Sequence, residues 1–247
     1  MSPLRTGRAR RLRAVTFDCW STLLVERNWT TAYHLRIDAL AELASGAGRP
    51  TRFDTLREAF DAAWNHHMAQ WVAGVSTNTR DLADHALERL GLRPEAKARE
   101  ELVRVWEEAS HCGDVEPVEG ALDTLRALAR EGLRLALVCD TGLTPGRVVR
   151  AHLERSGLLA HLDICVFSDE VGAPKPDPRP FLTALVALDV VPDESLHVGD
   201  LRRTDVAGAR DVGMRSIRLR AVYDDPSSLP EADAVADSHE AVRELLE

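Results

Sequence analysis

Short apolar runs that each end at a polar residue recur along this chain. They are rich in apolar and β-branched residues and lie between turn-forming residues, a pattern that predicts buried strands. Helical spacing of apolar residues separates them, and a last helix is expected from Ser238. The alternation predicts an α/β fold, a three-layer Rossmann-like sandwich around a mostly parallel sheet. The predicted strands cover residues 12–17, 133–139, 164–167, 196–198 and 214–219, and the helices between them cover residues 120–131, 144–156, 178–188 and 204–212.

One long segment interrupts this alternation. Its apolar residues follow helical spacing over residues 30–43, 53–72, 79–90 and 94–110. We therefore expect a helical cap domain inserted into the α/β core, entered and left through two short connections. The predicted division is a basic arm over residues 1–13, a core over residues 14–23 and 113–247, and the cap over residues 24–112.

All five tryptophans lie between the end of the first predicted strand and the end of the insertion. Trp64, Trp71 and Trp106 fall within predicted helices, and large aromatic side chains in a small bundle usually pack in its interior. We expect that role for these three. Trp20 and Trp29 instead flank the junction between the first strand and the insertion.

Composition and charge narrow the function classes. The chain is 45% hydrophobic, which is enough for a full core, and no apolar run approaches the length that crosses a bilayer. Acidic residues outnumber basic ones by 40 to 31, so binding to a nucleic-acid backbone is not expected. The four cysteines form no close pair, which predicts reduced thiols, no disulfide framework and a cytoplasmic protein. We expect a small molecule as its partner; the oligomeric state stays open.

The candidate chemistry lies where predicted strands end. Asp18, Asp140, Asp169 and Asp200 each follow such a strand directly or within two residues. Because parallel strands place their carboxyl ends at one edge of the sheet, these carboxylates are expected to gather there. Carboxylate oxygens are the ligands that hard divalent cations prefer.

A lysine joins this acidic set. Only Lys97 and Lys175 occur among the 31 basic residues, and Lys175 lies between two prolines that stiffen its loop. A compact ammonium suits a site crowded by carboxylates better than a broad guanidinium does.

Four segments together resemble the motifs of the haloacid dehalogenase superfamily. They occur in the family's order on an α/β pattern, and the resemblance covers nearly the whole chain. In the capped members of that superfamily, a helical domain is inserted just after the first motif. The segments are residues 17–23 (FDCWSTL), residues 138–142 (VCDTG), residues 175–178 (KPDP) and residues 198–200 (VGD) continuing to Asp205.

The resemblance implies a hydrolase in which Asp18 is the nucleophile. In members that act on phosphate esters, Mg²⁺ is bound by carboxylates equivalent to Asp18 and Asp200 and by a backbone carbonyl, here that of Trp20, with Asp205 orienting the metal site. Lys175 would neutralise the excess carboxylate charge. The expected function is therefore Mg²⁺-dependent hydrolysis of a small phosphate ester.

The resemblance also implies roles for the loops around the nucleophile. Thr22, Cys139 and Asp140 would complete the catalytic set, although the family usually carries serine or threonine where Cys139 stands. Trp20 and Thr141 would contact substrate. Arg27, from the start of the insertion, is a candidate for substrate binding, and we also weigh Arg36 for that role.

One departure from the phosphatase pattern bears on the reaction. Phosphatases of this family usually have a second aspartate two residues after the nucleophile, which protonates the leaving oxygen, and this chain has Trp20 there. An indole cannot exchange a proton in that role, so good leaving groups should be favoured. Candidates for a replacement acid are Glu26, Asp140, Asp169, His66 and His67.

Two other functions remain open. Haloacid dehalogenases have an aromatic residue at the position of Trp20 and need no metal, but they lack the Gly199-Asp200 pattern. The third possibility is a catalytically weak relative that binds a ligand or a partner. Cys19 and Cys139 are expected to be buried and inert, and His197 to be a core residue whose hydrogen bonds are satisfied.

Overall fold

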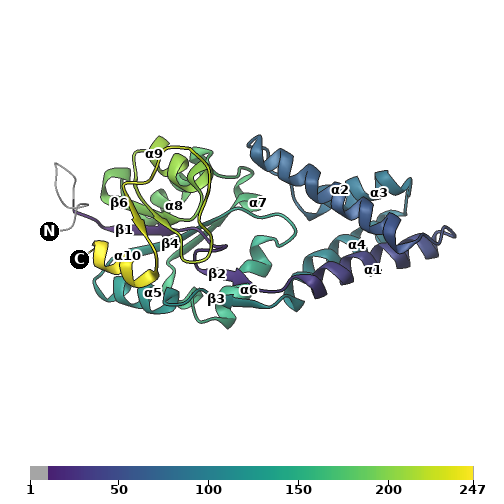
Figure 1. Cartoon of the computed structure of the whole chain (residues 1–247), viewed down its shortest axis with the longest axis horizontal. Helices are drawn as coiled ribbons and strands as arrows, with labels where there is room; N and C mark the ends of the chain where they lie inside the picture. The colour runs from purple at the N-terminus through teal and green to yellow at the C-terminus, as the bar shows by residue number, and fades with distance from the viewer. Residues whose placement is uncertain (1–10, 247) are drawn as a thin grey trace.

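The computed structural model describes residues 11–246, so most of the predicted basic arm lies outside the described residues. Its centre is a six-stranded sheet in which every pair of neighbouring strands is parallel. This confirms the predicted α/β fold (Figure 1). In spatial order the strands are β5 (Ile164–Phe167), β4 (Arg134–Cys139), β1 (Ala14–Phe17), β6 (Ser195–Gly199), β7 (Arg215–Leu219) and β8 (Ala234–Ala236).

Each face of the sheet packs against its own helices because side chains alternate along every strand. On β4, Leu135 and Leu137 join one hydrophobic cluster, whereas Ala136 and Val138 join the other. The first cluster includes residues of α5 (Ala121–Arg130), α6 (Gly146–Arg155) and α10 (His239–Leu246), and the second includes residues of α8 (Pro178–Leu188) and α9 (Ala207–Asp211). The central strands are thus buried on both sides.

The inserted segment forms four helices with a separate hydrophobic core. They extend away from the sheet, to the right in Figure 1. Trp106 and Phe60 pack edge to face in this core, with ring centroids 5.2 Å apart. The helices are α1 (Thr30–Gly46), α2 (Phe53–Val72), α3 (Thr79–Leu90) and α4 (Ala96–Ala109).

The two segments that connect the insertion to the core form hydrogen bonds with each other. The sequence pattern does not predict this pairing. β2 (Leu24–Glu26) and β3 (Val115–Pro117) form an antiparallel ribbon. Residues 24–26 are therefore strand, although we assigned them to the helical segment. Three-residue strands carry too little periodicity to be recognised, and β8 was missed for the same reason.

The remaining elements are short. The predicted helix 204–212 begins instead as a π-helical turn, η5 (Arg202–Val206), and continues as α9. The others are α7 (Ser168–Val171) and the 3₁₀ turns η2 (Ser110–Cys112), η3 (Leu159–His161) and η4 (Pro192–Glu194).

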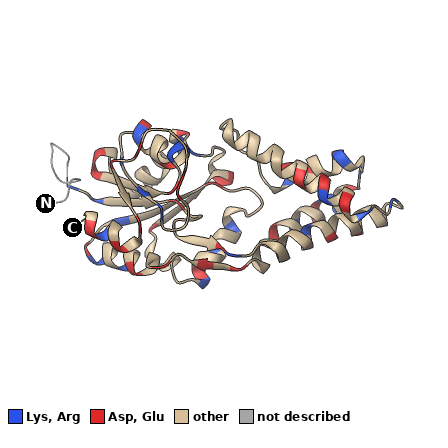
Figure 2. Cartoon of the chain, viewed as in Figure 1, with Lys and Arg blue, Asp and Glu red and all other residues tan. Residues whose placement is uncertain are grey.

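Acidic and basic residues are interspersed along the ribbon (Figure 2). Arg13, at the end of the predicted basic arm, pairs with Glu194 at 3.0 Å. Within residues 11–246, no helix is long and apolar enough to cross a membrane.

Candidate active site

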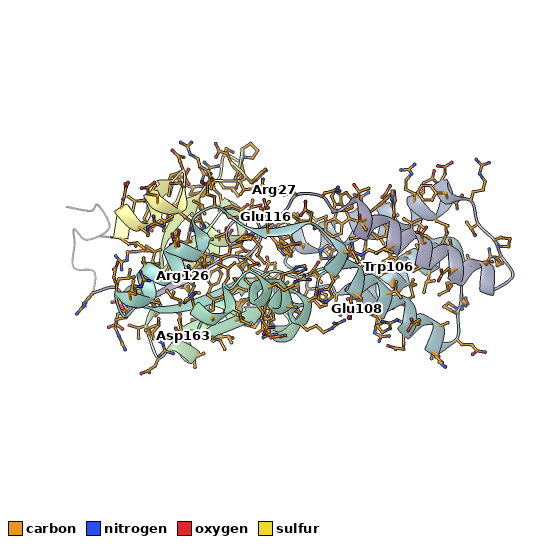
Figure 3. The ribbon with its side chains drawn as sticks, turned by 90° about the horizontal axis from the view of Figure 1, so that it is seen from below. Arg27, Trp106, Glu108, Glu116, Arg126 and Asp163 are labelled. Carbon is orange, nitrogen blue, oxygen red and sulfur yellow. The ribbon has the colours of Figure 1, made fainter. Side chains whose placement is uncertain are left out.

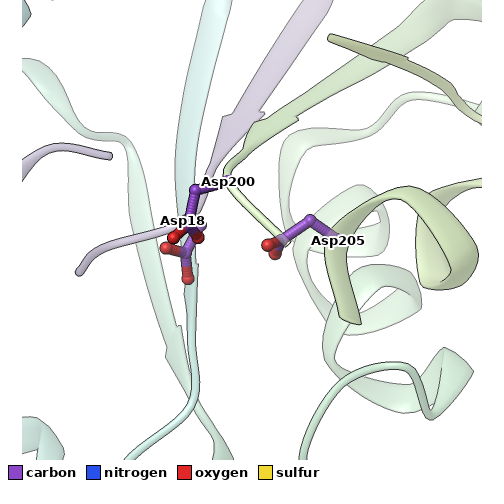
Figure 4. A group of neighbouring side chains, drawn as sticks. All are labelled: Asp18, Asp200 and Asp205. Atoms are coloured by element: carbon purple, nitrogen blue, oxygen red, sulfur yellow. The ribbon is translucent and has the colours of Figure 1, made fainter. Parts of the chain in front are cut away.

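Three buried carboxylates meet at the carboxyl edge of the sheet (Figure 4). Asp18 follows β1, Asp200 follows β6, and Asp205 belongs to η5. One carboxylate oxygen from each lies within 4.8 Å of the others. The backbone N–H of Asp18 donates to the Val198 carbonyl at 2.8 Å, so the pairing of β1 with β6 continues to the end of the strand and holds the first carboxylate in place.

Lys175 lies between two of these carboxylates. Its Nζ donates to Asp18 Oδ1 at 2.5 Å and to Asp205 Oδ1 at 2.7 Å. The backbone N–H of Lys175 also donates to Asp140 Oδ1 at 2.8 Å, which fixes the loop to the end of β4. The side chain is fully buried, and the surrounding carboxylates raise the pKa of this lysine well above its usual value despite the cost of burial.

Asp205 is held by hydrogen bonds to both of its oxygens. His197 Nε2 lies 3.1 Å from Asp205 Oδ1, and the Leu201 N–H donates to Oδ2 at 3.0 Å. Thr16 contacts the other ring nitrogen of His197 at 2.7 Å. A Cβ at Gly199 would collide with the Asp205 carboxyl, which explains why glycine ends β6. These contacts position Asp205 as an anchor for Lys175.

Burial and crowding separate the pKa values of the three carboxyls. Burial raises the pKa of Asp18 to about 7, although Lys175 opposes the change. Burial, with repulsion from Asp18 and Asp205, raises the pKa of Asp200 to about 9. Although burial opposes it, the pairing with Lys175 and His197 holds the pKa of Asp205 well below its usual range. The site therefore carries more potential negative charge than one ammonium can balance.

A cavity of about 630 Å³ opens above these groups, between the sheet edge and the helical insertion. Its volume is in the usual range for small-molecule sites. The sheet supplies the carboxylates and Lys175, and helix α2 supplies a row of side chains at helical spacing, namely Trp64, His67, Met68 and Trp71.

Sequence comparison assigns the family. A sequence profile of haloacid dehalogenase-like hydrolases matches residues 12–213. The chain belongs to this family. The mouse protein called haloacid dehalogenase-like hydrolase domain-containing protein 3 is 29% identical over 92% of this chain and 87% of its own length. The bovine protein of that name matches at 35% identity over 55% of this chain and only 53% of its own length.

Relatives of this haloacid dehalogenase-like hydrolase include a phosphatase and a dehalogenase. The phosphoserine phosphatase of Thermus thermophilus is 39% identical over 53% of this chain and 50% of its own length. The crystal structure of a 2-haloacid dehalogenase from Pseudomonas syringae superposes with a TM-score of 0.70 at 26% identity, covering 95% of this chain and 98% of that one. The fold is thus common to phosphate and carbon chemistry.

Most of the predicted site residues of this hydrolase line the cavity. Asp18, Lys175, Asp200 and Asp205 lie at its inner end, and Trp20, Asp140 and Thr141 line its wall. Thr141 is positioned by Ser168, whose Oγ accepts from the Thr141 N–H at 2.8 Å.

Arg27 lies outside the cavity lining. It directly follows β2, and its exposed guanidinium pairs with Glu116 of β3 at 2.6 Å (Figure 3). Arg36 lines the cavity instead. Its Nε donates to the Trp106 carbonyl at 3.0 Å and its Nη2 to Ser110 Oγ at 2.6 Å, so the bundle fixes its position.

Thr22 and Cys139 also lie outside the cavity lining. The Thr22 hydroxyl is buried and lacks a hydrogen-bond partner among the described residues, while its carbonyl accepts from His239 at 2.8 Å. Cys139 ends β4 with its side chain in the hydrophobic core, beside Cys19, and burial raises its pKa well above the usual value. The period-2 alternation of β4 turns the thiol away from the cavity.

The candidate replacement acids divide into two groups. Glu26, Asp140 and His67 line the cavity. Asp169 instead accepts from the Gly146 N–H at 3.1 Å at the start of α6, and the exposed His66 stacks on His85. His197 is buried and hydrogen-bonded, as expected, and in addition contacts Asp205.

The tryptophan prediction was partly wrong. Trp106 packs in the bundle core, but Trp64 and Trp71 line the cavity together with Trp20 and Trp29. Trp64, His67, Met68 and Trp71 follow i, i+3, i+4, i+7 spacing, which places them on one face of α2. The spacing of this stripe is visible in the sequence. An apolar stripe has the same spacing, however, whether it faces a hydrophobic core or a cavity.

Proposed function

We propose that this hydrolase cleaves small phosphate monoesters with Mg²⁺, using Asp18 as the nucleophile. The main support is the meeting of Asp18, Asp200 and Asp205 around Lys175. A haloacid dehalogenase has no need of this concentration of carboxylates. Phosphatases among the relatives agree with the proposal.

The donor set suits Mg²⁺. It offers only oxygen ligands, and three buried carboxylates share the single ammonium of Lys175, with burial raising the pKa values of Asp18 and Asp200. Asp18, Asp200 and the Trp20 backbone carbonyl would bind the ion. Asp205 is already bonded through both oxygens, so its role is to orient Lys175 and the loop. When bound, Mg²⁺ neutralises charge on the phosphoryl group as the nucleophile approaches.

The chain's own residues account for the remaining steps. An Asp18 oxygen attacks phosphorus, the bond from phosphorus to the ester oxygen breaks, and the departing alkoxide takes a proton from water. Water then attacks the phosphorus of the aspartyl phosphate, releasing phosphate and restoring Asp18. Lys175 holds Asp18 in position through its contact at 2.5 Å. The cavity walls reduce the access of bulk water.

The test is a screen of purified full-length protein against phenyl phosphate and 2-chloropropionate, each with Mg²⁺ and with EDTA. We expect phosphate release that requires Mg²⁺, and no halide release. Asp18→Asn should lower turnover at least about 10³-fold without unfolding the protein, because the amide keeps the shape but cannot attack. Halide release in EDTA would overturn the proposal in favour of dehalogenation.

Calorimetry with Mg²⁺ tests the metal site separately. Asp200→Ala should abolish binding. Asp177→Asn is the matched control, because Asp177 belongs to the third motif but caps α8 and lies outside the cavity lining. Binding by Asp200→Ala equal to that of the unmodified protein would contradict the metal assignment. Absence of turnover with both substrate classes would favour a binding protein.

A further inference from the structure

Much of the cavity lining is aromatic. Four of the five tryptophans line the cavity, namely Trp20, Trp29, Trp64 and Trp71, and Tyr223 joins them. They come from four places in the chain: the nucleophile loop, the N-cap of α1, the second half of α2 and the loop after β7. Folding therefore collects nearly all of the protein's indole rings around one space.

Trp71 is held in a fixed orientation. Its Nε1 donates to Asp140 Oδ2 at 2.8 Å, and the Arg203 guanidinium lies 3.9 Å from the ring centroid. The indole is thus bonded at its edge and stacked on one side, and it cannot turn away without breaking both contacts. A rigid ring loses little conformational entropy when a ligand packs against it.

Most polar side chains in the lining are already hydrogen-bonded within the protein. His67 Nδ1 lies 2.5 Å from the Thr77 hydroxyl, and Thr144 Oγ1 lies 2.8 Å from that of Ser110. Arg36 and Asp140 are similarly engaged. A sugar phosphate would bring several hydroxyl groups into a wall that offers them few free partners, and unpaired polar groups weaken binding.

From this arrangement we propose that the cavity accepts a phosphate ester whose leaving group carries a flat aromatic ring, with Trp64 as a specificity-determining residue. The inference rests on the proposed function. The phosphoryl group lies at the carboxylates and the ring packs among the indoles. Trp64 is the most suitable residue to test, because it is 37% exposed and contacts His67 rather than the reacting groups.

The experiment compares benzyl phosphate with cyclohexylmethyl phosphate. Both are esters of primary alcohols of similar size, so they differ mainly in the planarity of the ring. We expect a KM about tenfold lower for the benzyl ester, because aromatic pairing adds to apolar burial. Trp64→Leu should remove most of that preference, so that the ratio of the two KM values falls towards one. Trp64→Phe should retain it.

Phe53→Leu is the control, since Phe53 is an exposed aromatic on the same helix and lies outside the cavity lining. Phe53→Leu should change KM for neither ester. Equal KM values for the two esters, or equal losses on both in Trp64→Leu, would overturn the inference.

Binding of benzylphosphonate and cyclohexylmethylphosphonate, measured by calorimetry with Mg²⁺, separates the inference from the proposed function. Tighter binding of benzylphosphonate by a protein that hydrolyses no ester would refute the phosphatase and uphold the aromatic site. Hydrolysis of both esters with equal KM, and equal affinity for the two phosphonates, would uphold the phosphatase and refute the aromatic site.

Discussion

The Trp71 indole N–H donates to the Asp140 carboxylate at 2.8 Å, joining helix α2 of the insertion to the end of β4. The same carboxylate accepts from the Lys175 backbone N–H. One side chain of the insertion is thus linked through Asp140 to the loop that carries Lys175. Thr79 adds a second contact across this junction, donating to the Gly142 carbonyl at 3.1 Å.

Replacing Trp71 by Phe should weaken this junction. The ring remains, but a buried carboxylate oxygen loses its donor, which costs about 1–3 kcal/mol in the free energy of unfolding. We also expect KM to rise, because this part of the cavity wall is held less firmly in position. Urea unfolding and steady-state kinetics measure the two effects. Trp64→Phe, on the same helix without this bond, should leave stability unchanged within about 0.5 kcal/mol.

The two lysines allow a matched test of buried charge. Lys175→Met should lower the free energy of unfolding by about 3–5 kcal/mol, because it leaves buried carboxylates without their cation. Lys175→Arg should fold but turn over more slowly, since a guanidinium is too broad for the space between Asp18 and Asp205. Lys97→Met, at an exposed helix position, should change neither property. Equal stability of the two methionine variants in urea unfolding would contradict this account.

Trp20 occupies the position where phosphatases of this family usually carry a general acid. Without an acid at this position, turnover should depend steeply on the leaving group, so 4-nitrophenyl phosphate should be cleaved much faster than phenyl phosphate. Trp20→Asp should reduce that ratio by supplying a proton, whereas Trp20→Asn should not. The comparison uses kcat values for two substrates on each folded variant, which cancels changes in stability. An unchanged ratio in Trp20→Asp would show that another residue, such as Glu26, donates the proton.

The contribution of His152 to stability should be lost on acidification. Burial, together with Arg155 and His111, lowers its pKa from 6.5 to about 4. The unfolded chain then binds a proton between these values and the folded chain does not. The His152 contribution to the free energy of unfolding is therefore full above pH 6.5 and declines as the pH falls towards 4, by about 3 kcal/mol in total, whereas the raised pKa values of Asp18 and Asp200 act in the opposite direction.

His152→Gln should flatten this pH dependence, measured as the free energy of urea unfolding at several pH values. His34→Gln is the control, because His34 is exposed on α1. The same slope in both variants would show that other histidines dominate the acid response.

The sequence by itself determined the α/β alternation and the identity of the acidic edge. Parallel strands place Asp18 and Asp200 at the same edge of the sheet, and the compact ammonium of Lys175 suits an edge crowded by carboxylates. These residues were recognisable because the four family motifs occur in the expected order along the chain. The long inserted segment was equally plain, since its helical periodicity contrasts with the short apolar runs around it.

Tertiary structure alone decided which side chains face the cavity. Cys139 is turned into the core by the alternation of β4, and Arg27 is held outside by Glu116. Trp64 and Trp71 share an apolar stripe that suits a bundle core as well as a ligand wall, and only the packing of α2 over the sheet edge distinguishes the two. Local patterns record which face of an element is apolar. What that face meets depends on contacts between residues far apart in the chain.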